Sequence, residues 1–174
     1  MAIRRFSKRP AAGDQTQEGP SFDDVVVKVY RCAKVVRGGR RFSFGALVAV
    51  GDRNCRVGLG YAKANEVPSA VEKARKQATR AMQPVVLSGP TIPHAVTGQF
   101  GASRVRLIPA SAGTGVIAGA SVRAVLELAG VHDCLTKCYG STSPKNVVKA
   151  TMNALLMMRD PATVERLRGV SMAG

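Results

Sequence analysis

A run of cations around a glycine pair is the part of the sequence with the clearest chemistry. It spans residues 34–44, KVVRGGRRFSF. Its candidate contacts are Lys34, Arg37, Gly38, Gly39, Arg40 and Arg41. Guanidinium groups match phosphate oxygens with two parallel hydrogen bonds, and glycine permits positive φ and close approach of another backbone. The pattern predicts a glycine-hinged basic loop that holds a polyanion, and a solvated hairpin without a ligand is the alternative for such a loop taken alone.

The charge of the whole chain favours the polyanion. The 174 residues contain 26 Lys and Arg against 11 Asp and Glu, for a net charge of +15. Such an excess is typical of proteins that neutralise phosphates and release counterions. A membrane surface is the competing partner, but the chain lacks an apolar span of about 18 residues and has no Trp to anchor an amphipathic helix. We therefore expect nucleic acid as the partner, and no membrane.

The N-terminal segment and the cysteines indicate a cytoplasmic protein. Residues 1–20 are basic but lack the apolar core of a secretory signal. Reduced thiols are then expected at the four cysteines. Cys134 and Cys138 are four apart in a strand-like run, and Cys32 and Cys55 show no C-x-x-C spacing, which disfavours a zinc site. We expect neither a metal nor a cofactor.

The segment Gly113–Gly119, GTGVIAG, is the strongest enzymatic candidate. It follows a predicted strand and precedes a predicted helix, as a dinucleotide-binding turn does. The glycine spacing departs from G-x-G-x-x-G, a Walker lysine is missing, and Asp133 starts the next strand, whereas a ribose-binding acid should end it. A tight turn that brings helix and sheet together is the simpler interpretation. A small-molecule enzyme built on this turn remains the alternative function.

Other catalytic groups are poorly supported. His94 and His132 are the only histidines, and neither has a persuasive partner in the sequence. The serines of the small-residue turns lack a G-x-S-x-G elbow, and the acids are scattered singly, so no carboxylate pair is indicated. We expect a protein without catalytic activity.

The pattern of the first half predicts three antiparallel strands and a helix. Alternating apolar residues indicate strands over residues 25–30, 42–50 and 55–62. In the third strand Gly58 and Gly60 share a face and leave room for another backbone. Pro68 opens a helix over residues 69–83. This half forms an expected domain at residues 21–84, after an expected disordered basic tail at residues 1–20 and before a linker at residues 85–90.

The second half predicts a βαβ arrangement. The expected strands cover residues 92–100, 104–109 and 134–139, and the expected helices cover residues 121–129 and 145–158. Together they make a domain at residues 91–160 with a four-stranded or similar sheet and two helices, followed by a tail at residues 161–174. The fold class is therefore α+β with two small domains.

Four ordered strings carry a family resemblance. They are KVVRGGRRFSF, VGDRNCRVGLGYAKANEVPSA, SRVRLIPASAGTGVIAGASVRAVLELAGVH and YGSTSPKNVVKAT, within roughly residues 25–158. The chain closely resembles bacterial small-subunit ribosomal protein five. The resemblance implies an N-terminal domain similar to double-stranded-RNA-binding folds and a βαβ C-terminal domain. It also implies a structural component of the small subunit that binds 16S ribosomal RNA and contributes to subunit assembly and translational accuracy.

The resemblance extends to partners and to individual residues. It implies contacts with ribosomal proteins four and eight and a position near the messenger RNA path. The segment Lys34–Arg41 would approach the subunit head, and Gly115 and Arg123 would meet protein four. Further RNA contacts are expected from the cations of the first half: Arg53, Arg56, Lys63, Lys73 and Lys76.

Two departures from the family pattern bear on these contacts. Where Gly-Asp-Gly-Asn-Gly is common, this chain has GDRNC over residues 51–55, which adds Arg53 as a candidate contact. Where Lys-Ala-Arg-Glu-Val-Pro is common, Asn65 replaces the arginine. One RNA contact near residue 65 is therefore in question.

Overall fold

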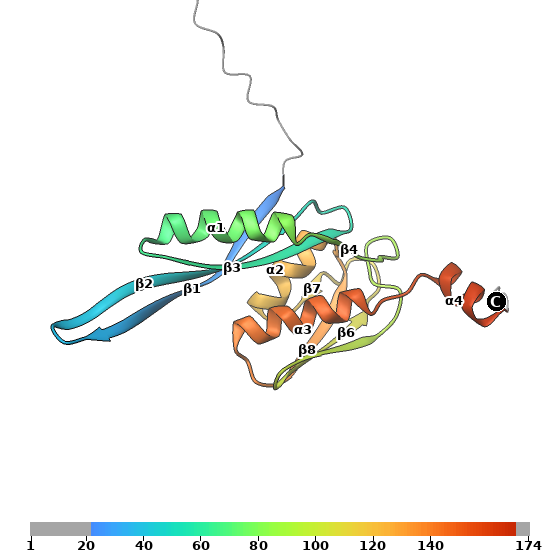
Figure 1. Ribbon diagram of the computed structural model, residues 1–174. Coiled ribbons are helices and arrows are strands. Elements are labelled where there is room, and N and C mark those ends of the chain that lie inside the picture. The colour runs from blue at the N-terminus through green and yellow to red at the C-terminus, as the bar shows by residue number, and fades with distance from the viewer. Residues whose placement is uncertain (1–21, 170–174) are drawn as a thin grey trace, which may run out of the picture.

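The computed structural model describes residues 22–169, and over that range the chain folds as α+β with two four-stranded sheets and four helices (Figure 1). The expected fold class is confirmed. The basic tail expected at residues 1–20 lies outside the described residues.

The first sheet has strand order β1-β2-β3-β4, and each pair of adjacent strands in it is antiparallel. Its strands are β1 (Asp23–Val36), β2 (Gly39–Gly51), β3 (Arg56–Ala64) and β4 (Gln83–Pro84). The first three were expected, although β1 and β2 are longer than their apolar runs. The fourth was not expected, because a strand of two residues that ends in proline has no periodic pattern.

Helix α1 (Val67–Arg80) covers one face of the first sheet. Its buried residues are alanines, and they pack against Ala46, Val48 and Val50 of β2. The expectation for Gly58 and Gly60 is confirmed, because a Cβ at either position would collide with a backbone carbonyl oxygen of α1. Small residues on both elements thus let the helix lie directly on strand β3.

The second sheet has strand order β5-β6-β8-β7, in which β7 runs parallel to β8 and the other pairs are antiparallel. Its strands are β5 (Val96–Phe100), β6 (Ser103–Pro109), β7 (Val116–Ile117) and β8 (Cys134–Gly140). Helices α2 (Ala120–Ala129) and α3 (Pro144–Leu156) follow β7 and β8. The strand expected from residue 92 begins only at Val96, and Ile92 is instead a buried loop residue of the core.

The C-terminal segment contains a helix that no pattern in the sequence predicts. Within the tail expected at residues 161–174, whose conformation the sequence leaves open, Pro161–Arg168 form helix α4, which Figure 1 shows at one end of the molecule. None of the residues of α4 is buried. A helix without an apolar face toward the core leaves little periodic signal in the sequence.

The two halves share one core. The face of the first sheet opposite α1 contributes Leu47, Ala49 and Val57 to a cluster that also contains Val125 and Leu126 of α2. The turn between β2 and β3 joins the halves through the backbone, because the Arg53 N–H donates to the Leu128 carbonyl (3.0 Å) and the Cys55 N–H to the Ala129 carbonyl (3.1 Å). The last carbonyls of helix α2 are therefore satisfied by the other half of the chain.

Candidate nucleic-acid interface

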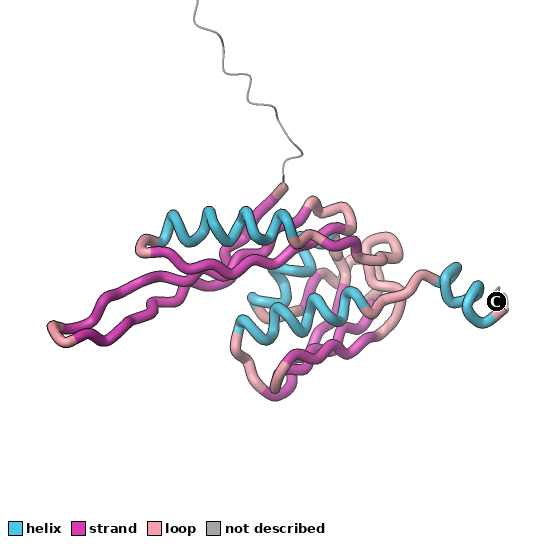
Figure 2. The backbone as a smooth tube through the Cα atoms, in the orientation of Figure 1, coloured by secondary structure: helices cyan, strands magenta, loops and turns pink. Residues whose placement is uncertain are grey.

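The basic segment forms the far end of a long hairpin. The expectation of a loop over residues 34–41 is wrong, because the β1–β2 ladder continues through Lys34↔Arg41, Val35↔Arg40 and Val36↔Gly39. Only Arg37 and Gly38 form the turn. The backbone trace in Figure 2 shows this hairpin reaching well beyond α1. Valine at positions 35 and 36 favours the strand conformation, and it extends the ladder into the cationic segment.

The hairpin end is exposed and cationic. Every residue from 33 to 42 is exposed, and Val35 retains 74% of its accessible surface. Lys34 and Arg41 are directly opposite each other, which places like charges side by side. Ion pairs among residues 22–169 join Arg53 to Asp23, Arg75 to Asp24 and Lys76 to Glu72, and none of these pairs involves a cation of the hairpin end. A phosphate could therefore approach the guanidinium groups without breaking one of these contacts.

The two glycines of the hairpin differ from each other. Gly39 has φ of +139°, a conformation that residues with side chains rarely adopt. Gly38 has no such φ and no atom within 4 Å of a Cβ placed there. In the protein alone, position 38 therefore does not require the conformational freedom of glycine, whereas position 39 does.

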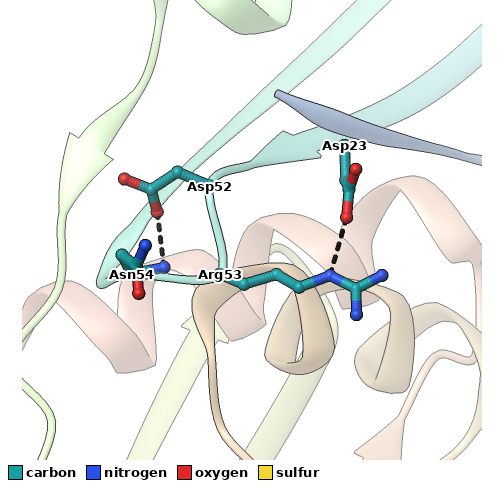
Figure 3. Close-up of polar contacts among 4 residues, drawn as sticks. All are labelled: Asp23, Asp52, Arg53 and Asn54. Atoms are coloured by element: carbon teal, nitrogen blue, oxygen red, sulfur yellow. Dashed lines mark hydrogen bonds and ion pairs between the residues drawn. The ribbon is translucent and has the colours of Figure 1, made fainter. Parts of the chain in front are cut away.

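Arg53 and Arg56 lie at the other end of β2 from the hairpin turn. The side chain of Arg53 pairs with Asp23 (Nε to Oδ2, 2.7 Å), as Figure 3 shows, and it is 67% exposed. Asp52 organises this turn, because its Oδ1 accepts from the Asn54 N–H (2.8 Å) and the Arg56 N–H (3.0 Å). The 13 residues of β2 separate this turn from the hairpin end by roughly 40 Å. The structure does not bring these two groups of cations together.

The remaining expected RNA contacts are exposed on β3 and α1. Lys63 is near the end of β3, and Lys73 and Lys76 are on the outer face of α1. Lys76 donates to Glu72 (2.7 Å), and this hydrogen bond and the charge of Lys76 lower the pKa of the Glu72 carboxyl. Arg75 and Arg80 share this outer face, and with Glu72, Lys76 and Thr79 they line one shallow hollow on α1.

Gly115 and Arg123 are both engaged within the chain. The Gly115 N–H donates to Asp133 Oδ1 (2.8 Å), and Arg123 Nη2 donates to the Val116 carbonyl (3.1 Å). Arg123 is nevertheless exposed, while the apolar face of its helix is buried and includes Val122, Val125, Leu126 and Ala129. The two hydrogen bonds fasten β7 to β8 and to α2.

The same contacts bear on the nucleotide-binding alternative. The Gly115 amide, which a phosphate would need, is already bonded to the Asp133 carboxylate, and the Gly115 carbonyl accepts from Cys134 N (3.1 Å). Gly113–Gly119 is thus a structural corner that contains strand β7.

Among residues 22–169, no three His, Cys, Asp or Glu side chains are grouped as metal ligands. Burial raises the pKa of the Cys134 thiol, which donates weakly to the Ile108 carbonyl.

No helix in the described part of the chain is both long and apolar enough to span a membrane.

Comparison with known proteins identifies the chain. Residues 22–86 match the family model described as ribosomal protein S5, N-terminal domain, and residues 98–168 match ribosomal protein S5, C-terminal domain. Relatives named small ribosomal subunit protein uS5 include one from Syntrophobacter fumaroxidans, 58% identical over 84% of this chain and 88% of its own length. Those from Rhodopirellula baltica and Rubrobacter xylanophilus are 56% and 51% identical, over 85% and 96% of this chain and 84% of each relative.

These matches define the class first: the chain is a ribosomal protein, a structural component of the small subunit and not an enzyme. Within that class it belongs to the ribosomal protein S5 family. Its location is the small subunit of the cytoplasmic bacterial ribosome.

Proposed function

We propose that this protein binds 16S ribosomal RNA chiefly through the end of the β1–β2 hairpin. The observation that carries the proposal is the exposed hairpin end, whose cations Lys34, Arg37, Arg40 and Arg41 face no acid among the described ion pairs. Cations with no acidic partner can bind RNA phosphates without losing an intramolecular contact. The RNA then releases its own counterions to the solvent, which favours binding. Glycine at position 39 lets the strand start where a side chain would be strained.

Further RNA contacts are proposed from the other exposed cations of the first half. Lys63, Lys73 and Lys76 would extend the contact along β3 and α1, and Arg53 and Arg56 would make a separate contact at the β2–β3 turn. Because Arg53 is paired with Asp23 and Lys76 with Glu72, these two residues should contribute less than the hairpin end. Recognition of this kind reads RNA shape and backbone more than sequence.

The corner made by β7 and α2 is the proposed contact with ribosomal protein four, through Gly115 and Arg123. Because Arg123 also holds the Val116 carbonyl, a partner that competes for its guanidinium would loosen β7. Ribosomal protein eight is the second proposed protein partner, and the messenger RNA path is the proposed neighbourhood. Through these contacts the protein would support subunit assembly and translational accuracy.

We also propose the division into domains at residues 21–84 and 91–160 with a linker at residues 85–90, which is close to the two family matches.

The test compares two charge-matched double variants of the full chain. Arg40→Gln with Arg41→Gln removes two hairpin charges, and Lys149→Gln with Arg159→Gln removes two exposed charges of the second half. Binding to a structured 16S RNA fragment should weaken for the hairpin variant, and the slope of log affinity against log salt should fall by about 0.9 per lost phosphate contact. The control variant, Lys149→Gln with Arg159→Gln, should lower this slope by less than the hairpin variant does. Equal slopes for the two variants would remove the hairpin from the RNA interface.

A further inference from the structure

The outer face of the second sheet is open and basic. Helix α3 covers the inner face, where a Cβ on Gly98 would collide with the Ala150 carbonyl oxygen. Val105 and Leu107 of β6 also point inward and are fully buried. The alternate residues point outward, and the exposed polar or aromatic ones are Thr97, Gln99, Arg104, Arg106, Lys137 and Tyr139. Leu135 is also exposed and lies beyond them on β8.

The register arranges these six side chains in two rows across three strands. One row is Gln99, Arg104 and Tyr139, and the other is Thr97, Arg106 and Lys137. Neighbouring strands are about 4.8 Å apart, and the rows are about 7 Å apart because they are two residues apart along each strand. The face therefore presents three cations and one aromatic ring within a compact area.

The cations of this face have no acidic neighbour in the sheet. Arg106 is directly opposite Lys137, and like charges in that position destabilise a pair of strands. None of β5, β6, β7 and β8 contains Asp or Glu, and the ion pairs described above lie in the first half of the chain. A bound polyanion would remove the repulsion between Arg106 and Lys137. This charge arrangement favours a nucleic acid over a protein surface of ordinary mixed charge.

The exposed aromatic ring indicates which form of nucleic acid this face would bind. Tyr139 is 49% exposed and lies beside Arg104, so its ring is available for stacking. A flat sheet does not fit the deep, narrow major groove of duplex RNA, whereas unpaired bases stack on aromatic side chains of an open sheet. We propose that the outer face of the β5-β6-β8 sheet binds single-stranded RNA, with Tyr139 stacking on a base and Arg104, Arg106 and Lys137 holding phosphates. The inference rests on the proposed function for the ligand class, RNA, but assigns a surface other than the hairpin.

The test uses the full chain and a short, labelled uridine oligonucleotide. For Arg106→Gln with Lys137→Gln, the slope of log affinity against log salt should fall by about 1.4, since each contact to a single strand contributes about 0.7. Tyr139→Leu should weaken binding about fivefold or more with the slope unchanged, because stacking releases no counterion. Tyr139→Phe keeps the ring and should bind as the unmodified protein does. Lys149→Gln with Arg159→Gln is the charge-matched control, and thermal melts confirm that each variant folds.

The outcomes separate this inference from the proposed function. If both sheet-face variants bind the oligonucleotide as the control does, the face does not bind RNA, and a protein partner there would give that result. If the hairpin variant alone loses RNA affinity, the inference fails while the proposed function stands. If neither surface matters for RNA affinity, both fail. Equal binding by Tyr139→Leu and Tyr139→Phe would overturn the stacking role.

Discussion

Arg53 holds a backbone conformation that most side chains avoid. Its φ is +56°, and that of Cys55, two residues later, is +66°. The resemblance to the family implies glycine at both positions, in the pattern Gly-Asp-Gly-Asn-Gly. The left-handed conformation is required here because it aims the Arg53 and Cys55 N–H groups at the last carbonyls of α2. The exposed pair of Arg53 with Asp23 stabilises the turn little, since surface ion pairs contribute about 0 to 1 kcal/mol.

The left-handed conformation predicts which of two substitutions at position 53 gives the more stable protein. Arg53→Gly and Arg53→Ala both remove the ion pair, but only glycine relieves the left-handed strain. The glycine variant should be more stable than the alanine variant by about 1 kcal/mol in urea unfolding. Asn54 is the matched control, because it is exposed and its φ is not positive. There the order should reverse, with alanine the more stable. The same order at both positions would contradict a left-handed Arg53.

At the scale of elements, the contact of α1 with β3 depends on the absence of side chains. Gly58 and Gly60 face Ala78 and Ala74 of the helix, and the obstacle to a Cβ is backbone rather than a movable side chain. The alanine-rich face of α1 has little apolar surface to lose, so close approach to the strand is what excludes water from it.

Gly60→Ala should therefore destabilise the protein by about 3 kcal/mol, the upper part of the range for overpacked cores. The helix must move away from β3, because the Ala74 carbonyl cannot turn aside without breaking its own hydrogen bond. Gly38→Ala serves as the control, since nothing lies within 4 Å of the added methyl group. Chemical unfolding measures both variants, with Gly38→Ala expected within about 0.5 kcal/mol of the unmodified protein. Comparable stabilities would show that α1 does not lie against Gly60.

At the scale of the whole molecule, three kinds of contact join the two halves. The core is continuous from β2 to α2, and the β2–β3 turn caps α2. At the start of α3, Lys145 Nζ is 3.7 Å from the ring centre of Tyr61 and 4.6 Å from that of Tyr30, distances at which cation–π attraction is appreciable. These contacts lie at different places along the interface and resist rotation of one half against the other.

We predict that the full chain unfolds in one transition despite its match to two family models. Separation of the halves would expose Leu47, Ala49 and Val57 to water, so neither half should remain folded once the other is lost. In calorimetry the measured enthalpy should equal the van't Hoff enthalpy. The near-ultraviolet signal of Tyr30 and Tyr61 should also melt together with the far-ultraviolet signal. Two separate transitions would show that the shared core is too weak to couple the halves.

Much of the fold was predictable because its signals are local. The apolar faces of α2 and α3, the paired glycines of β3 and the turn at Asp52 all follow from residues a few positions apart, whose side chains share a face by the geometry of helix or strand. The ordered strings that resemble ribosomal protein five also depend only on sequence. They were enough to place the chain in a family that the comparisons confirm.

Other features were decided by contacts between distant residues. The length of the hairpin depends on pairing between β1 and β2, so Lys34 and Arg41 could not be assigned to a strand from their own segment. Strand β7 exists because β8, about 18 residues later, pairs with it. The need for left-handed residues at Arg53 and Cys55 arises from α2, more than 70 residues away. The spacing of apolar residues within a short segment determines which face of a helix or strand is apolar. What packs against that face depends on which distant segments of the chain come together when it folds.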